Sequence, residues 1–144
     1  MPLILKEGYE NSIRNKMGVR DGELIDSDIN DKFVLDISEA YIVKRVPNYS
    51  KITDPIQQLY LENATVCYIC YMLGPSMDRR LNDKVSTLDL SWQKQKVDWE
   101  EKALEFLAEC DNSLAQITEV EVAMEVAQQL VKVSSNNRLP IGTT

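Results

Sequence analysis

Apolar side chains are most concentrated between Asp54 and Gly74, where the sequence is DPIQQLYLENATVCYICYMLG. Up to residue 63 only one stripe is apolar, whereas almost every residue of 64–73 is apolar or aromatic. Pro55 after an aspartate is typical of a first helical turn, and Gly74 followed by proline is typical of a helix end. The pattern predicts a central helix from Asp54 to Gly74, half buried at its start and covered on all sides at its end.

A short helix is predicted near the N-terminus, because apolar residues recur there every four positions, at Leu5, Tyr9, Ile13 and Met17. Gly18 follows directly and suits a helix C-cap. The next residues, VRDG, are predicted to form a turn-rich connector.

A second helix is predicted from Asp26 or Ser27, either of which can cap it, to Val46, because Pro47 ends it. Its apolar stripe, which we expect to face the core, consists of Ile29, Phe33, Ile37, Ala40 and Tyr41. The opposite face, which we expect to be solvated, carries Asp28, Asp31, Lys32, Asp36 and Glu39.

The segment Ser76–Ser91 is the one stretch of the chain that lacks a helical pattern. A partial alternation through Leu88, Leu90 and Trp92 is typical of a strand. We therefore predict an exposed loop or β-hairpin inserted between two helices. A non-helical segment of this length in a small domain is more often functional than idle.

The longest helix is predicted from Ser91 or Trp92 to Ile117. Its apolar face consists of Trp92, Trp99, Ala103, Phe106, Leu107, Cys110, Leu114 and Ile117. A further helix is predicted from Thr118, because Thr118 and Glu121 have the spacing of a capping box. Residues 120–126 also alternate as in a strand, so both interpretations of residues 118–133 stay open.

Together these elements predict a mainly all-α fold, a small bundle of four to five helices with a loop or hairpin inserted at about 76–91. The length of 144 residues is enough for one core without metal or disulfide support. We expect a single domain over residues 1–133. Residues 134–144 are polar and lack periodicity, which predicts a flexible tail.

The charge of the chain limits its partners. With 16 Lys and Arg against 23 Asp and Glu, the net charge is -7, which argues against a protein that grips nucleic-acid phosphates tightly. The N-terminal residues MPLILKEGYENS lack the basic region and apolar core of a signal peptide. No apolar run approaches the roughly 20 residues of a membrane span. We therefore expect neither a signal peptide nor a membrane-spanning segment.

Few residues of the sequence could form a catalytic, cofactor or metal site. Cys67 and Cys70 form a CxxC pair within the central helix, but the chain has no histidine and no second pair, so we interpret them as buried thiols. The run from Asp26 begins like a calcium loop but has aspartate and isoleucine where glycine and glutamate are required. We therefore predict no catalytic residue, cofactor or metal site. An enzyme would have to use carboxylates as its catalytic groups, or the tyrosines Tyr41, Tyr60, Tyr68 and Tyr71.

The order of elements resembles the head-to-tail connector or adaptor proteins of tailed bacteriophages. Three passages carry the resemblance: SDINDKFVLDISEAYIVKRVP (27–47), DPIQQLYLENATVCYICYML (54–73) and KVSTLDLSWQKQKVDWEEKALEFLAECD (84–111). The resemblance is one of pattern and order and covers roughly residues 5–117.

The resemblance implies a structural virion protein rather than an enzyme. Such proteins form a ring, commonly of twelve copies, at the neck between capsid and tail, and they are assembled in the host cytoplasm. The implied partners are the portal protein, a stopper or tail-terminator protein and other copies of the chain, with DNA passing through the ring. Twelve copies at -7 each would carry about -84 formal charges, and an acidic lumen would repel DNA phosphates.

The loop and the tail are the predicted partner-binding segments, because unpaired backbone with a few apolar anchors can order on a partner. The predicted contact residues are Arg79, Arg80, Leu88, Leu90, Arg138, Leu139 and Ile141. The two loop arginines are also explained as ordinary solvated side chains. A helical adaptor or regulatory protein unrelated to phages, which binds a partner peptide or helix, is the alternative function.

Overall fold

The computed structural model describes residues 2–85 and 97–123, with side chains for all of these except 82–85. This part of the chain is mainly helical and contains no strand, so the predicted all-α class is confirmed. The α-helices are α1 (Tyr9–Met17), α2 (Asp26–Ile29), α3 (Leu35–Arg45), α4 (Pro55–Leu73), α5 (Met77–Val85) and α6 (Trp99–Ala115), and two 3-10 turns are η1 (Tyr49–Lys51) and η2 (Gly74–Ser76).

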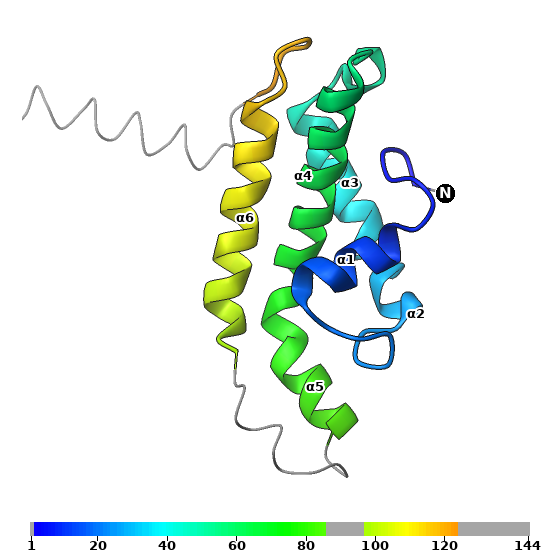
Figure 1. Cartoon of the computed structure of the whole chain (residues 1–144), viewed down its shortest axis with the longest axis vertical. Coiled ribbons are helices and arrows are strands. Elements are labelled where there is room, and N and C mark those ends of the chain that lie inside the picture. The colour runs from blue at the N-terminus through cyan, green and yellow to red at the C-terminus, as the bar shows by residue number, and fades with distance from the viewer. Residues whose placement is uncertain (1, 86–96, 124–144) are drawn as a thin grey trace, which may run out of the picture.

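The central helix is α4, as predicted. It begins where expected, because the Asp54 side chain accepts the N–H of Ile56 at 3.0 Å and Pro55 occupies the first turn. Figure 1 shows α4 and α6 side by side as the two long helices, with α1 crossing in front of α4 and α3 passing behind it. The other helices therefore pack around α4.

The core has two halves along α4. The half nearer α5 includes residues from α1, the α1–α2 connector, the second half of α4 and the start of α6: Ile13, Met17, Leu24, Ile69, Leu73, Met77, Trp99 and Phe106. The half nearer the start of α4 joins α3 to the end of α6: Ile42, Val46, Ile52, Leu61, Ala64, Cys110, Leu114 and Ile117. The apolar faces predicted for α1 and α6 are thus confirmed in the described residues. The stripe predicted for α4 is buried only at Ala64 and Cys67, whereas its first three residues, Ile56, Leu59 and Tyr60, are exposed.

Polar contacts fix the relative positions of α1, α4 and α6. Lys16 at the end of α1 forms an ion pair with Glu109 of α6. Asn63 of α4 donates to the same carboxylate at 3.3 Å and to Ser113 Oγ at 2.8 Å. The predicted C-cap of α1 is confirmed, because Gly18 has a left-handed φ of 73°.

The predicted helix over residues 26–46 is wrong in its continuity, since the chain forms α2 and α3 with a turn between them. The Asp31 carboxylate accepts the N–H of Phe33 at 2.8 Å, and this local bond replaces a helical one. The expected side-chain cap at Asp26 or Ser27 is also absent, because the residue at the N-cap of α2 is Ile25. The helix end before Pro47 is confirmed.

The prediction of a non-helical segment from Ser76 onward is wrong for Met77–Val85, which forms α5. The proline after Gly74 lies in the first turn of η2, where its missing N–H needs no partner, so the chain bends without leaving the helical conformation. Ser76 Oγ donates to the Leu73 carbonyl at 2.9 Å across the bend. Residues 86–91 of the predicted hairpin lie outside the described residues.

Two further boundaries differ from the prediction around α6. The helix begins at Trp99, because Asp98 is its N-cap and accepts the N–H of Glu101 at 3.2 Å; residues 91–96 lie outside the described residues. Residues 118–123 are not helical, so the predicted helix start at Thr118 is wrong. Residues 124–133 and the predicted tail 134–144 lie outside the description.

The non-helical residues 118–123 cross the end of the bundle. The Gln57 side chain accepts the N–H groups of Thr118 and Glu119, at 3.1 and 2.9 Å, and donates to Thr118 Oγ1 at 2.9 Å. The Glu119 carboxylate accepts both the N–H and the hydroxyl of Thr53. These bonds outweigh the local capping-box pattern because they satisfy several backbone groups at once.

Candidate partner-binding surface

Helix α3 is rotated about its axis relative to the prediction. The side chains that it buries are Leu35, Ser38, Glu39, Ile42 and Arg45. Two residues predicted to face the core are exposed: Phe33, in the turn before α3, is 65% accessible, and Ile37 is 46% accessible. Tyr41, predicted to face the core as well, is half-buried and stacks on Tyr68 of α4. Ile29 of α2 is buried as predicted.

The exposed positions form a continuous stripe, which we call the outer stripe: Phe33, Ile37, Ala40 and Lys44. Ile37, Ala40 and Lys44 are spaced by three and four residues, which places them on one face of α3, and Phe33 lies in the turn before this helix. The last three each lie two positions after a buried residue, which is about 200° around the helix axis. The outer stripe therefore points directly away from the core.

Glu39 is one cause of this rotation. It was predicted to be solvated, but it is 3% exposed. Its carboxylate accepts the N–H groups of Leu3, Ile4 and Leu5 at 2.9, 2.8 and 3.3 Å. A buried carboxylate needs such donors, and three successive amides with no secondary structure of their own need an acceptor. The carboxylate and the three amides thus satisfy each other's hydrogen-bonding groups.

Arg45 fixes the other end of α3. Its Nε donates to the Ala123 carbonyl at 3.0 Å, while its own carbonyl accepts the Ala123 N–H at 2.7 Å. Its guanidinium also forms an ion pair with Asp111 of α6 and a 3.3 Å hydrogen bond with Tyr41. Because both charged residues of α3 that point inward have several partners, the rotation that exposes the outer stripe is well determined.

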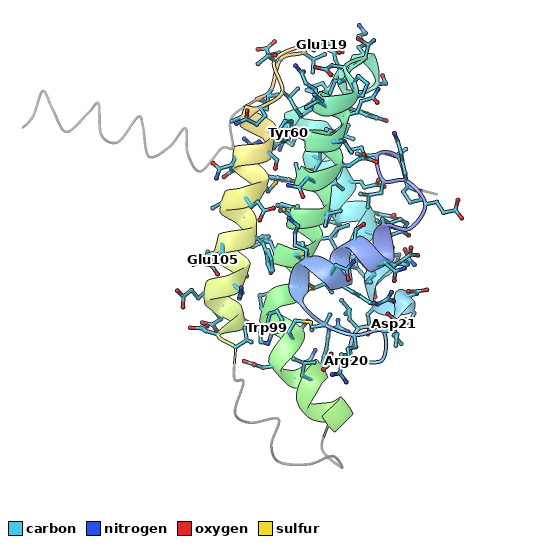
Figure 2. The ribbon with its side chains drawn as sticks, viewed as in Figure 1. Arg20, Asp21, Tyr60, Trp99, Glu105 and Glu119 are labelled. Atoms are coloured by element: carbon cyan, nitrogen blue, oxygen red, sulfur yellow. The ribbon has the colours of Figure 1, made fainter. Side chains whose placement is uncertain are left out.

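A second exposed apolar surface lies on the first two turns of α4. We call it the α4 patch: Ile56, Leu59 and Tyr60. Ile56 and Leu59 are 62% and 63% exposed, and the spacing of three and one places all three side chains on one face. Figure 2 shows Tyr60 near the upper end of α4, below Glu119. α3 covers α4 elsewhere, through Leu61 and Ala64.

The predicted contact arginines lie on α5 and behave differently from each other. Arg79 is exposed. Arg80 forms an ion pair with Asp28 at 2.9 Å, and its Nε donates to Ser76 Oγ at 2.8 Å. Arg80 therefore ties α5 to α2. The other predicted contact residues, Leu88, Leu90, Arg138, Leu139 and Ile141, lie outside the described residues.

The cysteines are free and buried, as predicted for the CxxC pair. Burial raises the pKa of the Cys70 thiol to about 12, which outweighs the opposing effect of Lys16. Burial likewise raises the pKa of Cys67. A thiol that stays protonated at neutral pH is a poor nucleophile and a poor metal ligand, so these residues act as small apolar side chains.

A shallow hollow beside the α1–α2 connector is lined by Arg14 and its neighbours. The arginine is already engaged: Nε donates to the Leu24 carbonyl at 2.6 Å, and its other nitrogens contact Asn11, Asp26 and, at 3.7 Å, Asp21. Its contacts hold the connector against α1. The hollow is accounted for by this structural role.

Among residues 2–85 and 97–123, no three histidine, cysteine or acidic side chains are grouped as metal ligands. In the same part of the chain, no helix has both the length and the apolar character that crossing a membrane requires.

Comparisons of the chain with known protein families, with curated proteins and with solved structures found no match.

The outer stripe and the α4 patch are the candidate partner-binding surfaces that the structure adds to the sequence. The residues of the outer stripe were visible as an apolar pattern, but its exposure depends on contacts from residues 3–5 and from Asp111 and Ala123. The residues of the α4 patch were visible as an apolar stripe of the central helix, but this stripe was predicted to be buried.

Proposed function

We propose that this chain is a structural subunit of a phage neck, an adaptor ring that joins the portal vertex of a capsid to the stopper or tail. The proposal starts from the resemblance in the order of helices. The observation that carries it in the structure is the outer stripe, because the large apolar side chains of Phe33 and Ile37 are exposed on the side away from the core and are suited to contact another molecule.

The exposed apolar surfaces are small, which fits a subunit that assembles on a template. The outer stripe offers two large apolar side chains, Phe33 and Ile37, and the α4 patch offers three. Stable interfaces usually bury at least about 1,200 Å² in total, with apolar anchors at the centre. We therefore propose that the isolated protein is a monomer or loose oligomer and closes into a ring on the portal.

The charge of the chain suits a channel for DNA in this proposal. The net charge of -7 would be repeated in each copy around the ring. A lumen with negative potential repels phosphates, so DNA passes without specific binding. Arg79, which is exposed on α5, is the proposed contact to an acidic portal surface.

The first test is the genome in which the chain is encoded. The proposal expects portal and capsid genes on one side of this gene and tail genes on the other. A gene surrounded by metabolic genes contradicts it and favours the alternative, an adaptor that binds a partner helix through the same outer stripe.

The second test is co-assembly. The purified chain and the portal protein of the same genome are mixed at near-physiological salt and analysed by light scattering and electron microscopy. The proposal expects a second ring seated on the portal ring. A portal that remains bare over a wide range of subunit concentrations contradicts it.

A further inference from the structure

We propose that the outer stripe of one copy contacts the α4 patch of the next copy, in a head-to-tail interface between identical subunits. The inference rests on the proposed ring, and it names the surfaces that would join its subunits. It starts from the presence of two separate apolar surfaces on one bundle, the stripe on the outside of α3 and the patch at the start of α4.

The two surfaces face different directions. α3 packs against α4 through the face that contains Ile42, whereas the outer stripe is on the opposite face of α3. The α4 patch lies on a part of α4 that α3 leaves uncovered, since Ile56 and Leu59 remain exposed. Two different surfaces on different sides of a subunit join copies head to tail, and such contacts give rings when the rotation closes.

Charge favours this pairing over contacts between two α4 patches. Cations lie at both ends of the outer stripe: Lys32 is placed with Nζ 5.2 Å from the centre of the Phe33 ring, and Lys44 is exposed at the other end. Asp31 and Asp36 also lie beside the stripe, at its start and middle, so the stripe has charges of both signs.

The α4 patch lies near carboxylates, so charge disfavours contact between two such patches. Helix α4 contains no lysine or arginine, and its one charged residue, Glu62, is one turn after Leu59. Asp54 and Glu119 are at the same end of the bundle. Pairing of the patch with the outer stripe therefore places carboxylates near Lys32 or Lys44, and in a chain of net charge -7 this reduces the repulsion between copies.

Cross-linking between two single-cysteine additions tests the interface with the isolated full chain. Ile37→Cys and Leu59→Cys are chosen because both wild-type side chains are exposed, whereas the three native cysteines are buried. The two proteins are mixed at high concentration and treated with a bismaleimide that has a short flexible spacer. Irreversible reaction traps even a weak complex.

The expected result is that the mixture gives at least fivefold more covalent dimer than either variant alone. Leu104→Cys is the matched control, since Leu104 is a similarly exposed apolar residue of α6 outside both surfaces. Mixtures that contain Leu104→Cys should match the background of the wild-type chain.

Three results would overturn the inference. The first is equal cross-linking with Leu104→Cys, which indicates random collision. The second is a dimer formed mainly by Ile37→Cys alone, which indicates a two-fold contact between outer stripes. The third is no dimer above background at any concentration.

This test is independent of the portal. A ring on the portal together with failure of the cross-link would leave the proposed function standing and remove the inference. A specific cross-link from a chain that does not bind a portal would support the interface between copies and remove the proposed function.

Discussion

At the scale of single residues, Glu39 connects the N-terminal segment to α3 through three backbone amides. We expect Glu39→Ala to lower the free energy of unfolding by about 2–4 kcal/mol, because it leaves buried N–H groups without an acceptor. Glu39→Gln keeps one acceptor oxygen and should cost less. Urea denaturation measures both changes.

Asp36→Asn is the matched control, since this carboxylate is exposed on the same helix. It should change the free energy of unfolding by less than about 0.5 kcal/mol. A Glu39→Ala variant as stable as Asp36→Asn would show that the amides of residues 3–5 do not depend on the carboxylate.

Glu109 makes the fold sensitive to acid. Its partial burial opposes ionisation, but the hydrogen bond from Lys16 outweighs this effect and lowers the pKa below its ordinary value of 4.5. A carboxyl group with a lowered pKa contributes stability that is present above its unfolded pKa and is lost as the pH falls through its folded pKa. The Glu109 contribution should therefore be present at neutral pH and disappear below about pH 4.5.

The measurement compares Glu109→Gln with the wild-type chain by urea denaturation between neutral pH and about pH 3. The variant should be less stable at neutral pH, and the difference should shrink toward acid. Glu105→Gln, at an exposed position of the same helix, should show no such trend. A difference that stays constant with pH would contradict the role assigned to the Glu109 carboxylate.

At the scale of elements, Gly74 at the end of α4 lies directly against α6. A Cβ added there would lie 2.9 Å from Ala103 Cβ and 3.3 Å from the Trp99 carbonyl oxygen, closer than side chains pack. We expect Gly74→Ala to lower the free energy of unfolding by about 1–3 kcal/mol, because the two helices must separate. Thermal and urea denaturation measure the loss.

A second substitution checks the cause. Ala103→Gly alone should cost about 1 kcal/mol, because glycine weakens a helix. The double variant of Gly74→Ala and Ala103→Gly should be more stable than the sum of the two losses predicts, since it removes the close contact. Additive losses would mean that the effect of Gly74→Ala comes from another source.

The crossing of residues 118–123 over the bundle end depends on Gln57. We expect Gln57→Ala to accelerate amide hydrogen exchange at Thr118 and Glu119 by tenfold or more, because these amides lose their acceptor. Gln58→Ala is the control, since Gln58 bonds only to the Ile52 carbonyl nearby. Equal exchange in both variants would contradict the assignment.

The helices differ in how far the sequence determines them. The core faces of α1, α6 and the second half of α4 were predicted correctly because their apolar spacing and their packing agree, whereas the stripe predicted for the first two turns of α4 is exposed. The rotation of α3 was not predicted, because it depends on partners of Glu39 and Arg45 that lie 34 to 78 residues away in the sequence. No local pattern indicates these distant partners. Helix α5 was missed although Met77 and Leu81 lie four residues apart and pack in the core, because Gly74 and Pro75 were interpreted as the end of the helical structure.

The candidate surface was predicted only in part, for the same reason. The sequence identified Phe33, Ile37 and Ala40 as one apolar stripe, and the structure places that stripe on the outside. Hydrophobic spacing specifies that a face will be covered. It does not specify whether the cover comes from the same chain or from another molecule.

At the scale of the whole molecule, the central claim is that the outer stripe is a surface for assembly. A charge placed in it should prevent close contact with a partner while leaving the subunit folded, because the position is solvent-exposed in the isolated chain. Ile37→Glu makes this change in the outer stripe. Leu104→Glu makes the same change at a similarly exposed apolar position of α6.

The most direct measurement is the fraction of portal rings that carry a second ring, counted by electron microscopy for the wild-type chain and both variants, with circular dichroism as the check on folding. We expect Leu104→Glu to match the wild-type chain and Ile37→Glu to require at least a tenfold higher concentration to reach the same occupancy. Equal occupancy of the portal by Ile37→Glu and the wild-type chain would contradict the central claim.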